Sequence, residues 1–219
     1  MLRTEELFDF NHTSAAEYLS RFEYPWQALK GINEFVVSLC KDLDKREYFE
    51  YGENILIHKS AEVSENVTIS GPCIIGAKSE IRHGAFIRGS ALIEKNCVIG
   101  NSVELKNVII SDCVQIPHFN YAGDSIFGYK SHMGAGSITS NVKSDRSLIT
   151  VRNDSEKIET GLKKFGAMLG DYAEIGCNTV LNPGTVIGRN STVYPLSSVR
   201  GTVPPDSIYK AEGFIVRKY

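Results

Sequence analysis

Aliphatic side chains recur at every sixth residue along most of this chain. A first run holds nine consecutive hits: Ile57, Val63, Ile69, Ile75, Ile81, Ile87, Ile93, Ile99 and Leu105. A second run, in a different phase, holds six more: Leu169, Ile175, Leu181, Ile187, Val193 and Val199. The residue two positions before each later aliphatic is small or of modest size, as Ala61, Cys73 and Ser79 are. The chain therefore carries a hexapeptide repeat.

A period of six fits neither the 3.6-residue turn of a helix nor the two-residue alternation of a strand. It fits a short strand plus a tight corner, in which each aliphatic side chain stacks on its copy from the coil below. Such stacking buries a core only when several coils are present, as they are here. We predict an all-β protein, a parallel β-helix over residues 54–205, rather than a β-sandwich with alternating strands. Five glycines directly follow repeat aliphatics, where tight corners need them: Gly76, Gly100, Gly170, Gly176 and Gly188.

The repeat is interrupted twice. Between Leu105 and Phe127 the phase slips by two residues, so the register breaks within residues 106–126. Residues 140–166 then leave the repeat with S-L-I-T-V-R followed by the polar N-D-S-E, which predicts a hairpin-like excursion. Long excursions in compact domains are usually functional or disordered, so we expect function near these irregularities. Residues 206–219 form a C-terminal tail.

Residues 1–53 follow a different pattern. Thr13, Ser14 and Glu17 predict a capping box at the start of a helix, and Pro25 suits the first turn of another. Apolar residues then recur at helical spacing: Trp26, Leu29, Ile32, Val36, Leu39 and Leu43. We predict two helices that pack on or near the first coils, with this stripe in the core rather than in a ligand site.

The composition narrows the classes of partner. Lys and Arg number 24 against 26 Asp and Glu, a formal charge of −2, which argues against nucleic acid or an anionic membrane as a partner. No apolar stretch approaches the length of a membrane span, and the start has no signal-peptide pattern. An odd number of cysteines without a C-x-x-C pair favours buried, reduced thiols in a cytoplasmic protein: Cys40, Cys73, Cys97, Cys113 and Cys177.

Five histidines raise a metal alternative, because carbonic-anhydrase-like members of this architecture bind zinc with three histidines. The spacings here are wide and include no H-x-x-x-H or H-x-x-x-x-H pair, so we predict no metal: His12, His58, His83, His118 and His132. His118 differs from the others because it falls inside the register break. A lone histidine in a solenoid is most often a packed or surface residue, and its surroundings decide between that role and catalysis.

Two cations stand near His118 in the repeat. Arg88 and Lys106 each follow a repeat aliphatic and lie eighteen residues apart, which is three hexads. If a coil contains three hexads, the two side chains stack on one corner of adjacent coils. Either Glu104 or Glu94 neutralises them, or they form a site for a phosphate or a carboxylate.

Four strings in the chain resemble a known family. Three are similar to the acetyltransferase domain of N-acetylglucosamine-1-phosphate uridyltransferases: G-N-S-V-E-L-K-N (100–107), H-F-N-Y-A-G-D-S (118–125) and G-A-G-S-I-T-S-N (134–141). The fourth, T-G-L-K-K-F-G-A-M-L-G-D (160–171), resembles the archaeal-type sugar-1-phosphate nucleotidyltransferase/acetyltransferases. The resemblance covers roughly residues 55–205. It implies a left-handed parallel β-helix, acetyl transfer from acetyl-CoA to glucosamine-1-phosphate, and a homotrimer with sites between neighbouring subunits.

The resemblance also implies a role for individual residues. His118 matches the catalytic base. The matching substrate contacts are Arg88, Lys106, Tyr121, Asn141 and Lys164. Cys177 matches a position near the acetyl group, and Pro195 is a further expected contact of acetyl-CoA. Separately from the resemblance, the positive charges of Lys210, Arg217 and Lys218 in the tail suit the phosphates of coenzyme A. Cys177 is expected to be a packing residue rather than a nucleophile, and Lys210 is equally compatible with a solvated tail. Two positions depart from the bacterial members, which carry asparagine at His132 and tyrosine at Val142.

Nothing in residues 1–53 resembles the nucleotide-binding domain with which the bifunctional members begin, so we expect no nucleotidyltransferase activity. We predict an acetyl-CoA-dependent N-acetyltransferase that acts on an amino-sugar phosphate or a nucleotide-linked amino sugar. A neutral imidazole suits the removal of a proton from the attacking amine. The alternative is a non-catalytic β-helix that binds a sugar phosphate or regulates a separate nucleotidyltransferase.

Overall fold

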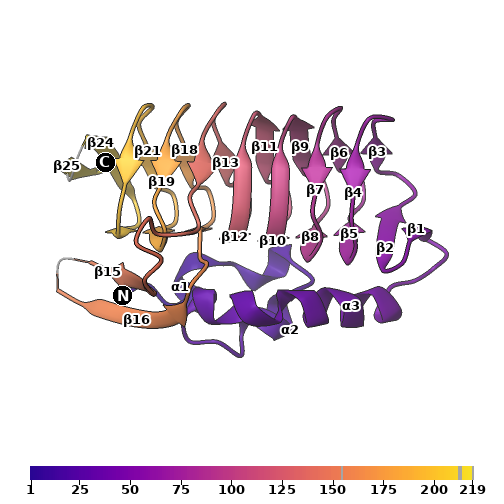
Figure 1. The fold of residues 1–219 in the computed structure, drawn as a ribbon, viewed down its shortest axis with the longest axis horizontal. Helices are drawn as coiled ribbons and strands as arrows, with labels where there is room; N and C mark the ends of the chain where they lie inside the picture. The colour runs from indigo at the N-terminus through magenta and orange to yellow at the C-terminus, as the bar shows by residue number, and fades with distance from the viewer. Residues whose placement is uncertain (154, 212–213, 219) are drawn as a thin grey trace.

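The computed structural model describes residues 1–153, 155–211 and 214–218 of the chain. Most of the chain winds as a parallel β-helix along the long axis of the molecule (Figure 1). Each coil has three faces, joined by corners. The strands of the first face are β2 (Ile55–His58), β5 (Cys73–Ile75), β8 (Ala91–Ile93), β17 (Ala167–Leu169), β20 (Thr185–Ile187) and β23 (Thr202–Val203), with the second halves of β10 (Glu104–Ile110) and β12 (Tyr121–Phe127).

The other two faces repeat with the same period. The second face consists of β3 (Glu62–Val63), β6 (Glu80–Ile81), β9 (Val98–Asn101), β11 (Gln115–His118), β13 (His132–Met133), β18 (Glu174–Ile175), β21 (Thr192–Val193) and β24 (Ser207–Ala211). The third face consists of β4 (Thr68–Ile69), β7 (Phe86–Ile87), the first halves of β10 and β12, β14 (Ile138–Thr139), β19 (Val180–Leu181) and β22 (Ser198–Val199). We call the corner from the second to the third face the second corner, and the corner from the third to the next first face the third corner.

The repeat residues form the core that their spacing predicts. Ile87 pairs with Leu105 one coil later, and Leu169 with Ile187, so a regular coil contains three hexads. These aliphatic side chains are fully buried inside the β-helix, and small residues such as Ala91 and Ser79 are buried at the corners. The predicted parallel β-helix is therefore confirmed.

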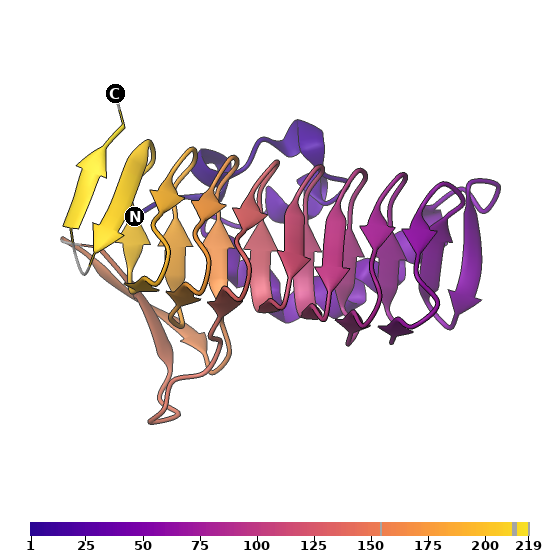
Figure 2. The same cartoon turned by 90° about the horizontal axis from the view of Figure 1, so that it is seen from above.

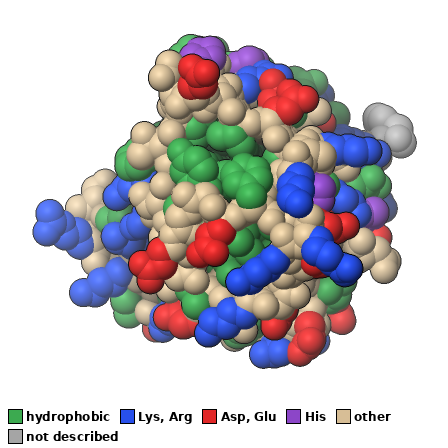
Figure 3. All heavy atoms as spheres, turned by 90° about the vertical axis from the view of Figure 1, so that its right-hand side faces the viewer, with side chains coloured by type: hydrophobic (Ala, Val, Ile, Leu, Met, Phe, Trp, Pro, Cys, Tyr) green, Lys and Arg blue, Asp and Glu red, His purple; other side chains and the backbone are tan. Residues whose placement is uncertain are grey.

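Three antiparallel additions complete the β structure. Strand β1 (Tyr48–Gly52) pairs with β2 at one end, and β25 (Phe214–Arg217) pairs with β24 at the other. A hairpin of β15 (Ile149–Arg152) and β16 (Lys157–Leu162) projects from the third corner between β14 and β17 (Figure 2). Viewed onto the β1 end, hydrophobic side chains gather in the middle of the surface and charged ones surround them (Figure 3).

The N-terminal segment lies along the first face over most of its length. Its elements are α1 (Thr4–Leu7), the 3-10 turn η1 (Phe10–His12), α2 (Ala16–Leu19), the 3-10 turn η2 (Pro25–Gly31) and α3 (Ile32–Asp42) (Figure 1). The Leu7 carbonyl accepts from the Asp171 amide near the last coils, while the Cys40 thiol contacts the Asn54 carbonyl at the first coil. The expected packing on or near the first coils therefore holds for α3, but the segment also extends along the first face to the last coils.

The predicted capping box is also wrong. Helix α2 begins at Ala16, and no side chain caps it. Thr13 Oγ1 and the Ser14 amide instead donate to Glu94 Oε1, at 3.0 and 2.5 Å, which ties the segment to the β-helix. By contrast, the Trp26 stripe is core as predicted. It packs on outward apolar residues of the first face: Leu56, Ile74, Leu92, Ile109, Ile126, Met168 and Val186.

The phase break consists of two single-residue deletions at the third corner. Three residues separate Ile87 from Ala91, but only two separate Leu105 from Val108, and again only two separate Ala122 from Ser125. Strands β10 and β12 therefore run through this corner without a break. The long insertion between β14 and β17 enters at the same corner in the next coil. All the irregularity of this region is concentrated on one edge.

Within the described residues, no helix is long and apolar enough to cross a membrane.

Candidate functional site

His118 does not lie on irregular backbone, contrary to the expectation from the phase break. It ends β11 on a regular hexad between the two deletions, and its side chain is exposed at the second corner. The His118 carbonyl accepts from the Gly136 amide of the next coil at 3.0 Å. The same bond recurs from Asn178 to Ala135 at 2.8 Å and from Leu196 to Cys177 at 2.9 Å.

These bonds place His118, Ala135, Cys177 and Pro195 in one column that runs parallel to the β-helix axis. Strand pairing fixes this order, because β11 pairs with β13, β13 with β18, and β18 with β21. Two of the predicted acetyl-CoA contacts, Cys177 and Pro195, are therefore aligned with the predicted base. Cys177 is exposed, so the expectation that it packs in the core is wrong.

The backbone and ring of His118 are both anchored. Nδ1 lies 3.2 Å from Asn101 Oδ1 of the preceding coil. When Asn101 Oδ1 accepts this bond, Nδ1 is its donor and carries the proton, and Nε2 has no hydrogen-bond partner in the described part of the chain. The His118 amide donates to Oδ1 of the buried Asn120 at 3.0 Å, and Asn120 Nδ2 in turn donates to the Gly134 carbonyl at 2.8 Å.

Gly100 explains how His118 comes so close to the coil below. A Cβ atom at Gly100 would overlap the Pro117 carbonyl oxygen, so only glycine allows the chain to pass there. Its φ is not positive, and close approach rather than a left-handed turn is what requires the glycine. Sequence reasoning missed Asn101 and Asn120, although both belong to strings that carry the family resemblance.

The third corner gathers the predicted substrate contacts. Lys106 follows Leu105, which pairs with Ile87, so it lies directly over Arg88 as the three-hexad spacing predicts. Arg88 Nη1 bonds Glu104 Oε1 at 2.7 Å, which raises the pKa of the guanidinium. Glu104, one of the two expected partners, therefore forms an ion pair with Arg88. Glu94 lies instead at another corner, with Thr13 and Ser14.

Lys106 has no such partner in the part of the chain that the structure describes. Among the described residues, neither Lys106 nor Lys164 has a carboxylate within 4.0 Å of its ammonium group, although the two lysines lie beside each other. Burial lowers the pKa of Lys106, and the charges of Lys164 and Arg88 lower it further, while Asp124 raises it. Two adjacent cations without a carboxylate partner among the described residues could hold an anion.

Lys164 reaches this corner because the two ends of the insertion meet there. The Phe165 amide donates to the Asn141 carbonyl at 3.0 Å, and the Gly166 amide donates to the Asp124 carbonyl at 2.8 Å. Asn141 and Lys164 therefore lie side by side although the insertion separates them in sequence.

Asp124 is the centre of a hydrogen-bonded group at the same corner. Its Oδ2 accepts from Asn141 Nδ2 at 2.6 Å and its Oδ1 from Asn107 Nδ2 at 2.9 Å. Asn141 Nδ2 also donates to the Tyr121 hydroxyl at 3.1 Å. Burial raises the pKa of Tyr121, and the carboxylates of Asp124 and Glu104 raise it further. Asp124 and Asn107 were not predicted, and both are the left-handed residues of the two shortened turns.

Tyr121 lies between the two corners. It is the first residue of β12, the third-face strand that begins just past the second corner, after His118. His118 and the five predicted substrate contacts thus border one strip of the third face. Lys210 lies farther along the axis, where the Tyr194 amide donates to the Tyr209 carbonyl at 2.9 Å, and its side chain is exposed. His132 lies on the second face with Nδ1 3.0 Å from Glu174 Oε2, and Val142 is exposed.

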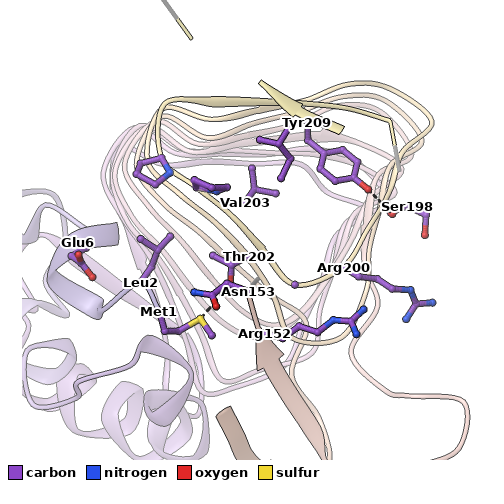
Figure 4. A pocket seen from close by; sticks show the side chains of 14 residues that line it. Met1, Leu2, Glu6, Arg152, Asn153, Ser198, Arg200, Thr202, Val203 and Tyr209 are labelled. Carbon is purple, nitrogen blue, oxygen red and sulfur yellow. Dashed lines mark hydrogen bonds between the residues drawn. The ribbon is translucent and has the colours of Figure 1, made fainter. Parts of the chain in front are cut away.

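A cavity of about 970 Å³ opens elsewhere, at the C-terminal end of the β-helix (Figure 4). Met1 and Leu2 line it together with Val203, Arg152 and Arg200. None of the predicted site residues lines this cavity. We place the candidate site on the third face, because the acidic, basic and amide groups that could perform chemistry converge there. Within the described residues, no group of three or more His, Cys, Asp or Glu side chains is arranged to hold a metal ion.

Comparisons with known proteins agree with the resemblance read from the motifs. The profile of the GMPPB C-terminal domain matches residues 69–162. The chain is 30% identical over 184 residues to the bifunctional protein GlmU of Methanococcus aeolicus, covering 75% of this chain and 44% of that protein. It is 34% identical over 167 residues to a bifunctional sugar-1-phosphate nucleotidylyltransferase/acetyltransferase of Sulfurisphaera tokodaii, covering 68% and 41%. The chain thus spans less than half the length of both relatives.

A search of solved structures finds the acetyltransferase domain of PglB from Neisseria gonorrhoeae in complex with acetyl coenzyme A. The TM-score is 0.36 and the sequence identity 14%, with 75% of this chain and 57% of that chain covered.

Proposed function

We propose that this chain is an acetyl-CoA-dependent N-acetyltransferase that acts on an amino-sugar phosphate of the glucosamine-1-phosphate type, or on a nucleotide-linked amino sugar. The observation that carries the proposal is the arrangement around the third face. At one corner stands an exposed histidine whose Nε2 has no hydrogen-bond partner among the described residues. At the other stand two lysines that have no carboxylate partner among those residues. The sequence similarity to bifunctional proteins with an acetyltransferase name supports the same reaction.

The third corner would bind the acceptor. Lys106 and Lys164 would meet its phosphate, with Arg88 at the edge of the site. Tyr121 and Asn141 offer a hydroxyl and an amide oxygen to the sugar. Lys106 is partly buried, so its contact with a phosphate is less screened by water than a surface ion pair would be.

His118 would act as the general base. Nε2 takes a proton from the amino group of the acceptor as its nitrogen attacks the thioester carbonyl carbon. The new C–N bond forms and the C–S bond breaks, which releases the coenzyme A thiolate. The proton then passes from the imidazolium to that thiolate. Asn101 keeps Nδ1 protonated, so that Nε2 faces the amine.

The column at the second corner would hold acetyl-CoA. Ala135, Cys177 and Pro195 extend from His118 along the axis, and an elongated ligand that follows them would bring its thioester to His118. Lys210 would meet a phosphate farther along. Within the described residues, no hydrogen bond joins the exposed Cys177 thiol to a base that would make it a nucleophile.

We also propose that the protein is a homotrimer, with the third face at a boundary between subunits. Flat faces of stacked strands offer surfaces for threefold packing. Light scattering at micromolar concentration should give three times the monomer mass of 24.2 kDa. A monomer would count against the shared site.

An acceptor screen tests the function. The protein is mixed with acetyl-CoA and amino-sugar phosphates or nucleotide-linked amino sugars, and released thiol is measured. Thiol release with glucosamine-1-phosphate, and none with N-acetylglucosamine-1-phosphate, is the expected result. Binding of the sugar phosphate without thiol release from any acceptor would instead favour the non-catalytic alternative, in which the β-helix regulates a separate nucleotidyltransferase.

A further inference from the structure

Asp124 is an unusual carboxylate. It is only 6% exposed, and it forms no ion pair with the two lysines that share its corner. Both of its oxygens instead accept from side-chain amides, one from Asn107 in the coil before it and one from Asn141 in the coil after it. Burying a carboxylate costs free energy unless hydrogen bonds compensate it. The position of Asp124 beside two lysines with which it forms no ion pair therefore needs an explanation.

The two deletions at the third corner put Asp124 in this position. The shortened turns bring Asn107 and Asp124 into left-handed conformations, with φ of 53° and 48°, in consecutive coils. Asn107 Nδ2 also donates to the Leu29 carbonyl of η2 at 3.1 Å. The N-terminal segment therefore holds Asn107, and through it Asp124, in place, although that segment takes no part in the proposed chemistry.

We propose that Asp124 is a positioning residue of the acceptor site: its carboxylate fixes the orientation of the Asn141 amide and keeps the neighbouring lysines available to an anionic group of the ligand. This inference rests on the proposed function for the identity of the acceptor. It does not make Asp124 a catalytic residue, because the carboxylate is covered by the residues that it orients.

The orientation of Asn141 follows from its hydrogen bonds. Nδ2 is committed to Asp124 and to the Tyr121 hydroxyl. Oδ1 has no hydrogen-bond partner in the described part of the chain, so it remains an acceptor for a hydroxyl or amino group. Without a carboxylate at position 124, the amide could turn over and present a donor instead.

The effect on the lysines is electrostatic. Lys106 faces Asp124 on β12, Lys164 at the end of the insertion and Arg88 after β7. Burial and the two cations lower its pKa, and Asp124 alone among these groups raises it. Replacing the carboxylate with a neutral amide should lower the pKa of Lys106 further, so the anion site should lose charge at a lower pH.

Asp124→Asn is the central variant, because it removes the charge and keeps the shape. Calorimetric titration with glucosamine-1-phosphate at pH 7 should show binding about tenfold weaker than in the wild type. At pH 9 the difference should widen. Binding of coenzyme A should be unchanged, because its column lies at the other corner. Asp145→Asn, an exposed aspartate that bonds Ser147 within the insertion, is the matched control and should bind both ligands like the wild type.

Two further measurements keep the inference falsifiable. NMR titration of the Lys106 ammonium group, without any ligand, should show a lower pKa in Asp124→Asn than in the wild type. If Asp124→Asn does not fold, the exchange Asp124→Asn with Asn141→Asp restores one carboxylate and one amide. That double variant should fold but bind the acceptor poorly, because a negatively charged carboxylate at position 141 then faces the anionic acceptor.

The outcomes separate this inference from the proposed function. A wild type that binds neither glucosamine-1-phosphate nor acetyl-CoA contradicts the function, while the Lys106 titration still decides the electrostatic role of Asp124. Equal acceptor affinity in Asp124→Asn and wild type at both pH values overturns the positioning role. So does an unchanged Lys106 pKa, or full acceptor affinity in the double variant.

Discussion

The second and third corners of this β-helix border the same face but differ in construction. At the second corner the coils stack in regular register, and the same backbone hydrogen bond repeats from His118 to Ala135 to Cys177. At the third corner two turns lose a residue and the next gains an insertion of many residues. Regular stacking yields a straight column, whereas the irregular corner gathers unlike side chains from distant parts of the chain.

The two corners suit ligands of different shape. A straight column of exposed residues suits an extended molecule that lies along the axis. A compact cluster of lysines, amides and a tyrosine suits a small, polar and anionic molecule. The reacting groups would meet between them, where His118 ends one column and Tyr121 begins the strip that leads to the cluster. Mutations at the second corner should therefore mainly lower the catalytic rate, whereas mutations at the third corner should mainly weaken binding of the acceptor.

The largest effect should come from His118. His118→Ala should lower kcat by roughly 10²- to 10⁴-fold, the usual contribution of a positioned general base. The side chain is exposed, so the melting temperature should stay nearly unchanged. His83→Ala is the matched control, because His83 is exposed two coils earlier in the same hydrogen-bonded series, where the Ser102 amide donates to its carbonyl at 3.3 Å. Near-normal activity of His118→Ala would contradict the catalytic role.

Gly100→Ala tests whether the regular corner positions His118. The added methyl group would push against the Pro117 carbonyl and displace the histidine, and a misplacement of about 1 Å can cost roughly 10²-fold in rate. Gly76→Ala provides the comparison, since its Cβ would crowd the Glu94 backbone, at 2.6 Å, on another corner. Both variants should lose stability in chemical denaturation, but only Gly100→Ala should lose more activity than its folded fraction explains.

Lys106→Ala should weaken acceptor binding by about 10- to 150-fold, because a hydrogen bond to a charged group is worth about 1.5–3 kcal/mol. Arg88→Ala should have a smaller effect, of about tenfold or less, because Glu104 already engages its guanidinium. The KM for acetyl-CoA should change in neither variant. Steady-state kinetics with each substrate varied in turn checks this. An unchanged acceptor KM in both variants would mean that the cations serve only the fold.

The smallest expected effect is a pH dependence at the third corner. Because burial lowers the pKa of Lys106, this lysine loses its proton at a lower pH than an ordinary lysine. Acceptor KM should therefore rise as the pH increases through this lowered pKa, while acetyl-CoA KM stays level. Lys106→Arg, whose side chain remains charged, should abolish the rise. A rise that persists in Lys106→Arg would assign it to another group.

The repeat made the core predictable, because every aliphatic position has to stack on its copy in the next coil. Ile87 and Leu105 are paired and buried as their spacing predicts. The path of the N-terminal segment was missed, although its signal is present in the sequence. From β2 to β20 the first face carries an apolar residue on its outer side in each coil, as at Ile74 and Leu92, while the equivalent residues of the second face include Glu62 and Glu80.

The site was only partly predictable for a physical reason. The phase shift shows how many residues are deleted, but not at which corner, because a deletion at any corner gives the same later register. The deletions in fact lie before and after His118, so His118 itself lies on regular backbone, although the sequence assigned it to the irregular region. The hydrogen bonds of Asp124 and Asn101 with site residues depend on how adjacent coils stack, and no local sequence pattern predicts them.

A crystal structure with coenzyme A and glucosamine-1-phosphate tests the two-corner account most directly. The account predicts that coenzyme A lies along Ala135, Cys177 and Pro195, with its sulfur next to His118. The phosphate of the acceptor should lie within hydrogen-bond distance of Lys106 and Lys164, with the amino nitrogen directed toward Nε2 of His118. Coenzyme A in the cavity beside Arg152, or a phosphate away from both lysines, would contradict the account.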